Sequence, residues 1–140
     1  MAERARWVHI DEARIEQYAA GFRRATESEP AEERPAEREP EVAAAFAICM
    51  NAINFGSGWW PTIRKRPGLS GYSTMAAGVS ERFASLGPWS GEELVAMSAS
   101  KIAGVLGQDS GHPLMEQFAA ALRDVGAHLL EDHGGDYLSI

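Results

Sequence analysis

Residues 42–61 read VAAAFAICMNAINFGSGWWP, and this stretch decides the fold that the rest of the chain has to accommodate. It opens with an uninterrupted apolar run, Val42–Met50, in which alanines dominate and β-branched residues are few. This composition favours a helix over a strand. Because the run is apolar on every side, it predicts a central, fully buried helix from Val42 to Ile53.

A bend follows the helix, where Gly56 and Gly58 alternate with the rings of Phe55, Trp59 and Trp60. The two glycines are expected to end the helix. Flexible glycines beside rigid rings are not typical of a hydrophobic core, but they suit the wall of a pocket that binds a flat, polar ligand. One of the two tryptophans is expected to be a core anchor.

Composition limits the classes of partner. The chain has 140 residues, 45% of them apolar, which fits one domain or a piece of one. Its net charge of −7 argues against a long nucleic acid, because a protein that binds one normally presents a basic face. A small ligand with one phosphate remains compatible, since a few local cations can hold it. The basic run Arg64-Lys65-Arg66 fits that role, or a merely solvated loop.

The chain carries no secretory signal at its N-terminus and no apolar run of the ~20 residues that a membrane helix needs. The expected compartment is therefore the cytoplasm, with no membrane contact. The single cysteine, Cys49, lies in the apolar run and is interpreted as a buried structural thiol. Metal-ligand spacing, a glycine-rich phosphate loop and a nucleophile elbow are all missing from the sequence, so no metal or cofactor is expected.

Helical periodicity predicts further helices on both sides of the central one. A first helix is expected from Asp11 to about Arg24, with one buried face formed by Ile15, Tyr18, Ala19 and Phe22. Residues 26–41 are rich in Glu, Arg, Ala and Pro and are interpreted as a charged loop or linker. Residues 63–69 are also expected to form a loop.

Capping signals mark the helices of the second half. Ser70 or Ser73 is expected to cap a helix whose buried stripe is Met75, Val79, Phe83 and Leu86, and which stops at Gly87-Pro88. Two short helices should follow as a compact hairpin, the first opened by a Ser90/Glu93 capping box and the second running from Ser98 to Gly107. A last helix starts near His112-Pro113, ends at Gly134-Gly135, and buries Leu114, Phe118, Leu122, Val125 and Leu129. The fold class is therefore all-α.

Three blocks of sequence together resemble the queuosine salvage protein family, the queuosine 5′-phosphate N-glycosylase/hydrolases. The first is the apolar helix leading into Asn51-Ala52-Ile53-Asn54-Phe55-Gly56-Ser57-Gly58-Trp59. The second is Ser70-Gly71-Tyr72 at the start of a helix with small residues at Ala76 and Ala77. The third is Leu129-Leu130-Glu131-Asp132-His133-Gly134-Gly135, followed by an aromatic residue and a leucine.

The resemblance implies cleavage of the N-glycosidic bond of queuosine 5′-monophosphate, which releases queuine for reuse in tRNA modification. It also implies an all-helical fold related to helix-hairpin-helix DNA glycosylases. The substrate-binding residues that it implies here are Asn54, Phe55, Trp59, Ser70, Gly71 and Tyr72. The rings are suited to stacking on the base, and the Asn54 amide offers both a donor and an acceptor. A structural interpretation is equally open for Asn54, which can instead cap the end of the central helix.

The resemblance covers the chain from about Trp7 onward, but only the first half or so of a family member. The family's carboxylate lies in the other half, within a Tyr-Lys-Arg-type motif that this sequence lacks, so no catalytic residue is assigned. We therefore expect residues 1–140 to be the N-terminal portion of an incomplete domain, with a C-terminal half or a partner chain completing it. The alternatives are a non-catalytic module that binds a nucleoside or base, and a helical protein-interaction domain.

Overall fold

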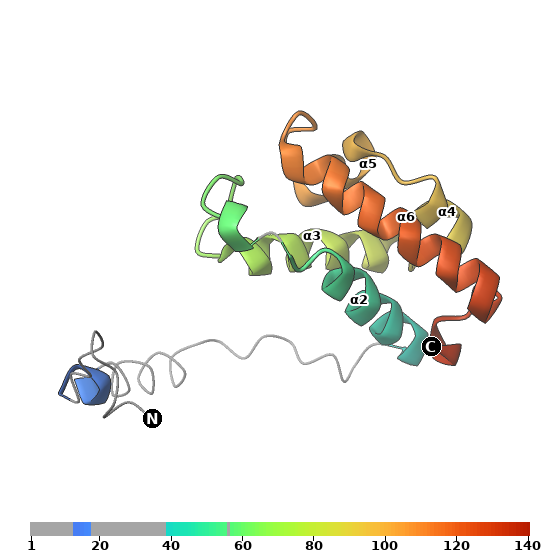
Figure 1. The fold of residues 1–140 in the computed structure, drawn as a ribbon, viewed down its shortest axis with the longest axis horizontal. Helices are drawn as coiled ribbons and strands as arrows, with labels where there is room; N and C mark the ends of the chain where they lie inside the picture. Colours follow the sequence, from blue (N-terminus) through green and yellow to red (C-terminus); the bar gives the residue numbers. More distant parts are fainter. Residues whose placement is uncertain (1–12, 18–38, 56) are drawn as a thin grey trace, which may run out of the picture. The chain divides into compact units, whose positions relative to one another are not determined.

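A computed structural model describes residues 13–17, 39–55 and 57–140, and these residues form helices joined by turns and loops, without a strand (Figure 1). The all-α class is therefore confirmed for this part of the chain. The chain divides into two units, Met1–Ala36 and Glu37–Ile140. The elements of the second unit are α2 (Pro40–Ala52), η3 (Ser57–Trp59), α3 (Gly71–Leu86), α4 (Gly91–Val95), α5 (Ala99–Leu106), α6 (Pro113–His133) and η4 (Tyr137–Ser139).

The first predicted helix is seen only in part. Residues 13–17 are helical, whereas Asp11 and the segment from Tyr18 to Arg24 lie outside the described residues. Ile15 was expected on a buried face, but 56% of it is exposed. The apolar stripe of a single helical turn stays in contact with solvent unless another element covers it. Most of the predicted linker, residues 26–38, also lies outside the described residues.

Helix α2 begins at Pro40, so the last two residues of the predicted linker belong to the helix. Proline suits this first helical position because its missing N–H would have no partner there. The expectation that α2 is buried on all sides is wrong. One face, formed by Ala45, Cys49 and Met50, is buried, while Ala47 is exposed. Alanine presents so little apolar area that an alanine-rich helix can sit with one face in water at small cost.

Helix α3 begins and ends where the local chemistry predicts. The Ser70 hydroxyl accepts a hydrogen bond from the Ser73 N–H at 3.0 Å, which decides between the two candidate caps. Gly87 ends the helix at a positive φ of 79°. Three of the four predicted stripe residues, Met75, Val79 and Phe83, are buried, but Leu86 is 72% exposed. That part of the prediction is wrong because, among the described residues, no element covers the last residue of α3.

Helices α4 and α5 both form as predicted. Ser90 and Glu93 form a reciprocal capping box, and Ser98 caps α5. The two helices do not pack mainly on each other as a hairpin; each packs against the long helix α6 instead (Figure 1). Gly126 permits the close approach of α4 and α6, because a Cβ there would lie 2.8 Å or less from the Val95 nitrogen and the Gly91 oxygen.

Helix α6 is the element against which α2, α4 and α5 all pack. Its predicted start and stop are confirmed: His112 is the N-cap, and Gly134 follows the last turn in the left-handed conformation. Its buried face includes Leu114, Phe118, Leu122 and Leu129, while Val125 is only partly buried.

The turn η4 returns to the core after α6. Tyr137 is buried, and its hydroxyl donates a hydrogen bond to the Trp89 carbonyl at 2.8 Å. The same hydroxyl lies 3.9 Å from the buried Cys49 sulfur, which is the structural thiol that the sequence predicts. Among the helices described, none is long and apolar enough to cross a membrane.

Candidate functional site

The predicted aromatic bend lies at the surface of the helical unit, against the first turns of α6. Phe55 follows the end of α2 and is 49% exposed. Its ring meets the buried ring of Phe118 edge-on, with 5.3 Å between the ring centroids. One face of the Phe55 ring is therefore anchored on α6, and the remainder is available to a ligand.

Trp59, in η3, is held in a similar way by the start of α6. Its ring lies edge-on to the imidazole of His112, 6.1 Å away between centroids, and 46% of the residue is exposed. The Thr62 hydroxyl donates to the Trp59 carbonyl at 2.6 Å and lies 2.9 Å from His112 Nε2. Because His112 Nδ1 accepts the Leu114 N–H, the imidazole proton is on Nε2 and points to Thr62. This chain of hydrogen bonds fixes the position of η3.

Trp60 is the core anchor of the pair, as expected for one of the two tryptophans. Its ring is partly buried and stacks on Tyr72, with centroids 5.9 Å apart and planes 19° from parallel. Gly71 allows this arrangement, since a Cβ there would lie 2.9 Å from the Trp60 ring. The indole N–H of Trp60 is buried and has no acceptor among the described residues.

The predicted block Ser70-Gly71-Tyr72 therefore has a structural role. Ser70 caps α3, Gly71 makes room for Trp60, and Tyr72 stacks on that ring. These three residues support the bend from behind, whereas Phe55 and Trp59 are at its surface. Trp60 connects Trp59, its neighbour in the chain, with Tyr72 at the start of α3, whereas Phe55 contacts α6 through Phe118.

Asn54 is exposed, and its side-chain amide makes no hydrogen bond to another described residue. Its backbone N–H bonds to the Asn51 carbonyl. The capping role proposed for the Asn54 side chain is therefore not seen; Asn51 is the residue whose amide bonds back to the helix, donating to the Ala47 carbonyl at 2.9 Å. The Asn54 amide is left with both donor and acceptor capacity beside the exposed rings.

The loop predicted at residues 63–69 is confirmed. Gln108 holds this loop in place, a contact that the sequence did not predict. The Gln108 side chain accepts from the Arg64 N–H and donates to the Arg64 carbonyl, each at 2.8 Å. Within the basic run, Arg66 forms a two-pronged ion pair with Glu81. Arg64 and Lys65 are exposed.

A second concave region was not predicted. A cleft of about 610 Å³ lies along α3, α4 and α5 and is lined by residues such as Arg82, Trp89, Lys101 and Gly104. The one sequence signal for it was Leu86, an apolar residue at the last position of α3, which lines this cleft instead of the core.

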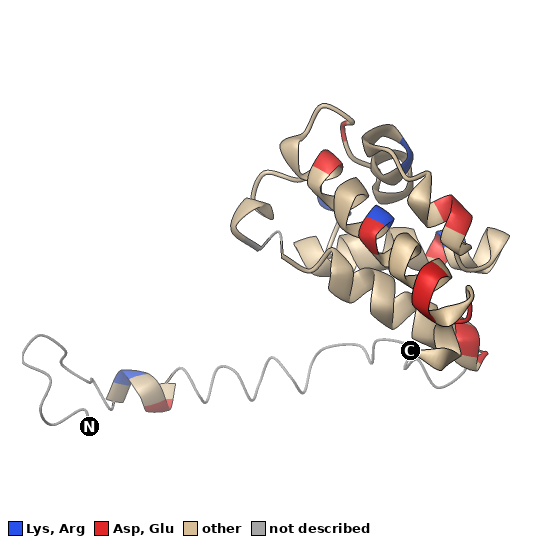
Figure 2. Cartoon of the chain, turned by 45° about the vertical axis from the view of Figure 1, so that its right-hand side comes forward, with Lys and Arg blue, Asp and Glu red and all other residues tan. Residues whose placement is uncertain are grey.

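Acidic residues dominate the outer faces of α4 and α6 (Figure 2). Groups of three or more side chains suited to a metal ion do not occur among the residues described. Comparison with family models, with curated proteins and with solved structures finds no match to this chain. The function must therefore be argued from the geometry and from the sequence resemblance.

Proposed function

We propose that the chain is the base-recognition part of a cytoplasmic nucleotide hydrolase of the queuosine salvage kind. In this proposal a planar, purine-like base lies on the exposed rings of Phe55 and Trp59, and the Asn54 amide reads its edge. Trp60 and the block Ser70–Tyr72 hold the bend in place. The ligand is a small nucleotide, queuosine 5′-phosphate, or its free base, queuine.

The observation that carries the proposal is the outward placement of one amide and two rings on a single bend. Large apolar side chains usually fill the interior, yet Phe55 and Trp59 are about half exposed while Trp60 is turned inward. Both exposed rings are braced by α6, so they are held ready for a ligand without a further loss of side-chain freedom. Stacking of a base on an aromatic ring contributes about 1–3 kcal/mol.

The proposed reaction needs more than the base site. Hydrolysis of an N-glycosidic bond passes through an oxocarbenium-like state that a nearby carboxylate stabilises. No carboxylate of this chain is assigned that task, because the family places it in a motif that the chain lacks. We therefore expect residues 1–140 to bind queuosine 5′-phosphate without releasing queuine.

Titration calorimetry of the chain with queuine and with queuosine 5′-phosphate tests the base site. Trp59→Ala and Phe55→Ala should each weaken binding about 5- to 150-fold, the equivalent of the stacking energy. Leu86→Ala serves as a control, because it removes an exposed apolar side chain that lies at the cleft and not at the bend. Wild-type chain that binds neither compound, with its helical spectrum intact, would refute the proposal.

A second candidate function is that of a helical domain that docks a protein through the exposed rings. The observation that favours it is that Phe55 and Trp59 lie outside the cleft along α3–α5. This alternative predicts that the wild-type chain and the Trp59→Ala variant are equally indifferent to queuine. The same titration therefore separates the two candidates.

A further inference from the structure

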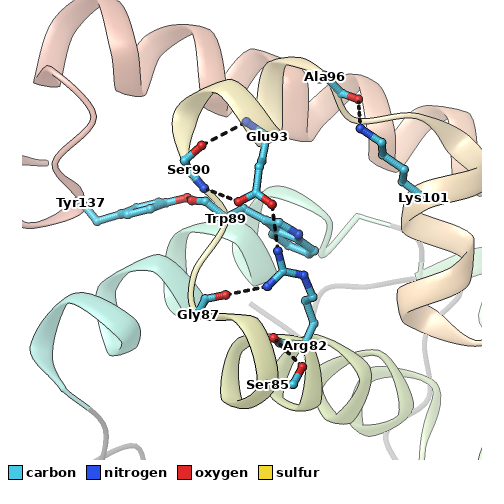
Figure 3. Close-up of polar contacts among 9 residues, drawn as sticks. All are labelled: Arg82, Ser85, Gly87, Trp89, Ser90, Glu93, Ala96, Lys101 and Tyr137. Atoms are coloured by element: carbon cyan, nitrogen blue, oxygen red, sulfur yellow. Dashed lines mark hydrogen bonds and ion pairs between the residues drawn. The ribbon is translucent and has the colours of Figure 1, made fainter.

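The cleft along α3, α4 and α5 is a separate concave site that the proposed function does not use. Its polar groups lie around the buried ring of Trp89, with Arg82 on one side and Lys101 on another (Figure 3). At about 610 Å³ its volume falls in the range of sites that bind small organic molecules.

Two glycines shape the cleft in different ways: Gly78 allows two helices to pack closely, and Gly104 leaves space open. At Gly78 a Cβ would lie 2.5 Å from the Val105 carbonyl oxygen, so this glycine brings the backbones of α3 and α5 into contact. At Gly104 a Cβ would meet nothing within 4 Å. Packing therefore does not require glycine at position 104, in the interior of α5, where glycine disfavours the helix. Its effect in the structure is to leave the space empty.

The floor of the cleft is rigid. Trp89 is only 3% exposed, and its ring meets Phe83 edge-on with 5.1 Å between centroids. Its carbonyl accepts the hydrogen bond from the buried Tyr137 hydroxyl. Leu86 and Val105 add partly or largely exposed apolar surface at the wall. An apolar ligand would therefore meet a surface that needs no rearrangement to receive it.

Within the described part of the chain, one cation of the cleft has no carboxylate partner. Glu81 binds Arg66, and this contact lowers the pKa of the Glu81 carboxyl. Arg82 donates to Glu93 at 2.9 Å and to the Gly87 carbonyl at 2.8 Å, and Glu93 also accepts the Ser90 N–H.

Lys101 differs from Arg82, the other cation that lines the cleft. Its Nζ donates to the Ala96 carbonyl at 3.0 Å (Figure 3), and among the residues that the structure describes no carboxylate lies within ion-pair distance of it. An ammonium group has three donors, so two remain for an acceptor on a ligand. The carboxylates of the cleft are thus already neutralised by their partners, whereas Lys101 is not.

We infer that this cleft binds a small organic anion whose aromatic or apolar body lies over Leu86, Val105 and the edge of Trp89, while its acidic group contacts Lys101. Carboxylates and sulfonates of this shape share the required chemistry. The site is independent of the aromatic bend, so it stands whether or not the chain binds queuine.

Two fluorescent probes test the inference on the whole chain. One is 1-anilinonaphthalene-8-sulfonate, which has the apolar body and an anion, and the other is N-phenyl-1-naphthylamine, which has a similar body and no charge. Each is titrated into the wild type and into Lys101→Gln, Gly104→Ala and Gly104→Met. Lys65→Gln is the matched control, since it removes one lysine charge from the loop and not from the cleft.

The expected result is one saturable site for both probes. Lys101→Gln should weaken the sulfonate probe about two- to fivefold and leave the neutral probe unchanged, while Lys65→Gln changes neither. Gly104→Met should weaken both probes by about tenfold or more, because its side chain occupies the cleft, with Gly104→Ala in between. Circular dichroism and thermal unfolding establish that each variant is folded.

Equal binding of the sulfonate probe by wild type and Lys101→Gln would overturn the assignment of the anion contact. Unchanged binding of both probes by a folded Gly104→Met variant would overturn the site itself. Absence of saturable binding to the wild type would do the same.

Discussion

At the scale of single residues, the Trp60 indole N–H is a hydrogen-bond donor without a partner among the described residues. The group is buried, and a buried donor without an acceptor costs about 1–3 kcal/mol. Trp60→Phe removes this donor and keeps a ring against Tyr72, so its stability should stay within about 1 kcal/mol of the wild type. Trp60→Ala loses the ring as well and should cost about 3 kcal/mol.

Urea unfolding followed by circular dichroism measures both Trp60 variants. A phenylalanine variant as unstable as the alanine variant would mean that the indole N–H contributes a hydrogen bond. Comparison of Trp60→Phe with the wild type isolates the donor, and comparison of the two variants isolates the stacked ring, because both lack the indole nitrogen and only the alanine variant lacks a ring.

At the scale of helices, two glycines allow the effect of packing between helices to be distinguished from the effect of helix propensity. Gly104 and Gly126 lie in the interiors of α5 and α6. Gly104→Ala should stabilise the protein by about 0.8–1 kcal/mol, because the new Cβ meets open space. Gly126→Ala should destabilise it by about 1–3 kcal/mol despite the same gain in propensity, since its Cβ would press on Leu94 and on the backbone of α4.

Thermal unfolding of the two alanine variants, measured side by side, checks this opposition. The midpoint should rise for Gly104→Ala and fall for Gly126→Ala. A rise in both midpoints would show that propensity, and not the contact between α4 and α6, governs position 126, and a fall in both would contradict the open space at Gly104.

At the scale of the whole molecule, the Cys49–Tyr137 contact links α2 to η4, and the burial of the Cys49 thiol makes stability depend on alkaline pH. Burial raises the pKa of the Cys49 thiol from 9.0 to about 12, an effect that the Tyr137 hydrogen bond only partly opposes. Burial also raises the pKa of Tyr137. Between pH 9.0 and about 12 the native thiol keeps a proton that the unfolded thiol loses. Because the native state then binds more protons, its stability falls as the pH rises.

The expected slope from Cys49 approaches about 1.4 kcal/mol per pH unit above its unfolded pKa. Urea titrations at several pH values from neutral to about 10.5, which span the onset of thiol ionisation in the unfolded state, measure this slope. Cys49→Ala should start from a lower stability at neutral pH and then lose less with rising pH than the wild type does. Parallel curves for the two proteins would contradict a raised thiol pKa.

The limits of the helices were largely predictable from the sequence, because capping is local chemistry. Ser70, Ser90, Ser98 and His112 each bond to a backbone N–H two or three residues further along the chain, and Gly107 and Gly134 end their helices in the left-handed conformation. These interactions need no distant partner. The composition of the bend after α2 likewise marked Asn54 and the rings as candidates for a surface role.

Burial was harder to predict, because it depends on residues far apart in the chain. Helix α2 is covered on one face and not on all sides, and Leu86 continues an apolar stripe yet lies in water. Which of two adjacent tryptophans turns inward depends on Gly71, where a missing Cβ leaves room for the Trp60 ring. No local pattern around Trp59 and Trp60 contains that information.

Local sequence patterns were enough to predict that the described part of the chain is helical, where most of its helices begin and end, and which bend carries the unusual rings. Which faces are buried, which rings are exposed, and the presence of a cleft lined by Lys101 away from the bend follow only from the tertiary structure. The physical reason is the distance along the chain over which each interaction acts. Caps and turns are formed by residues close in sequence, whereas burial and clefts result from all the contacts between helices.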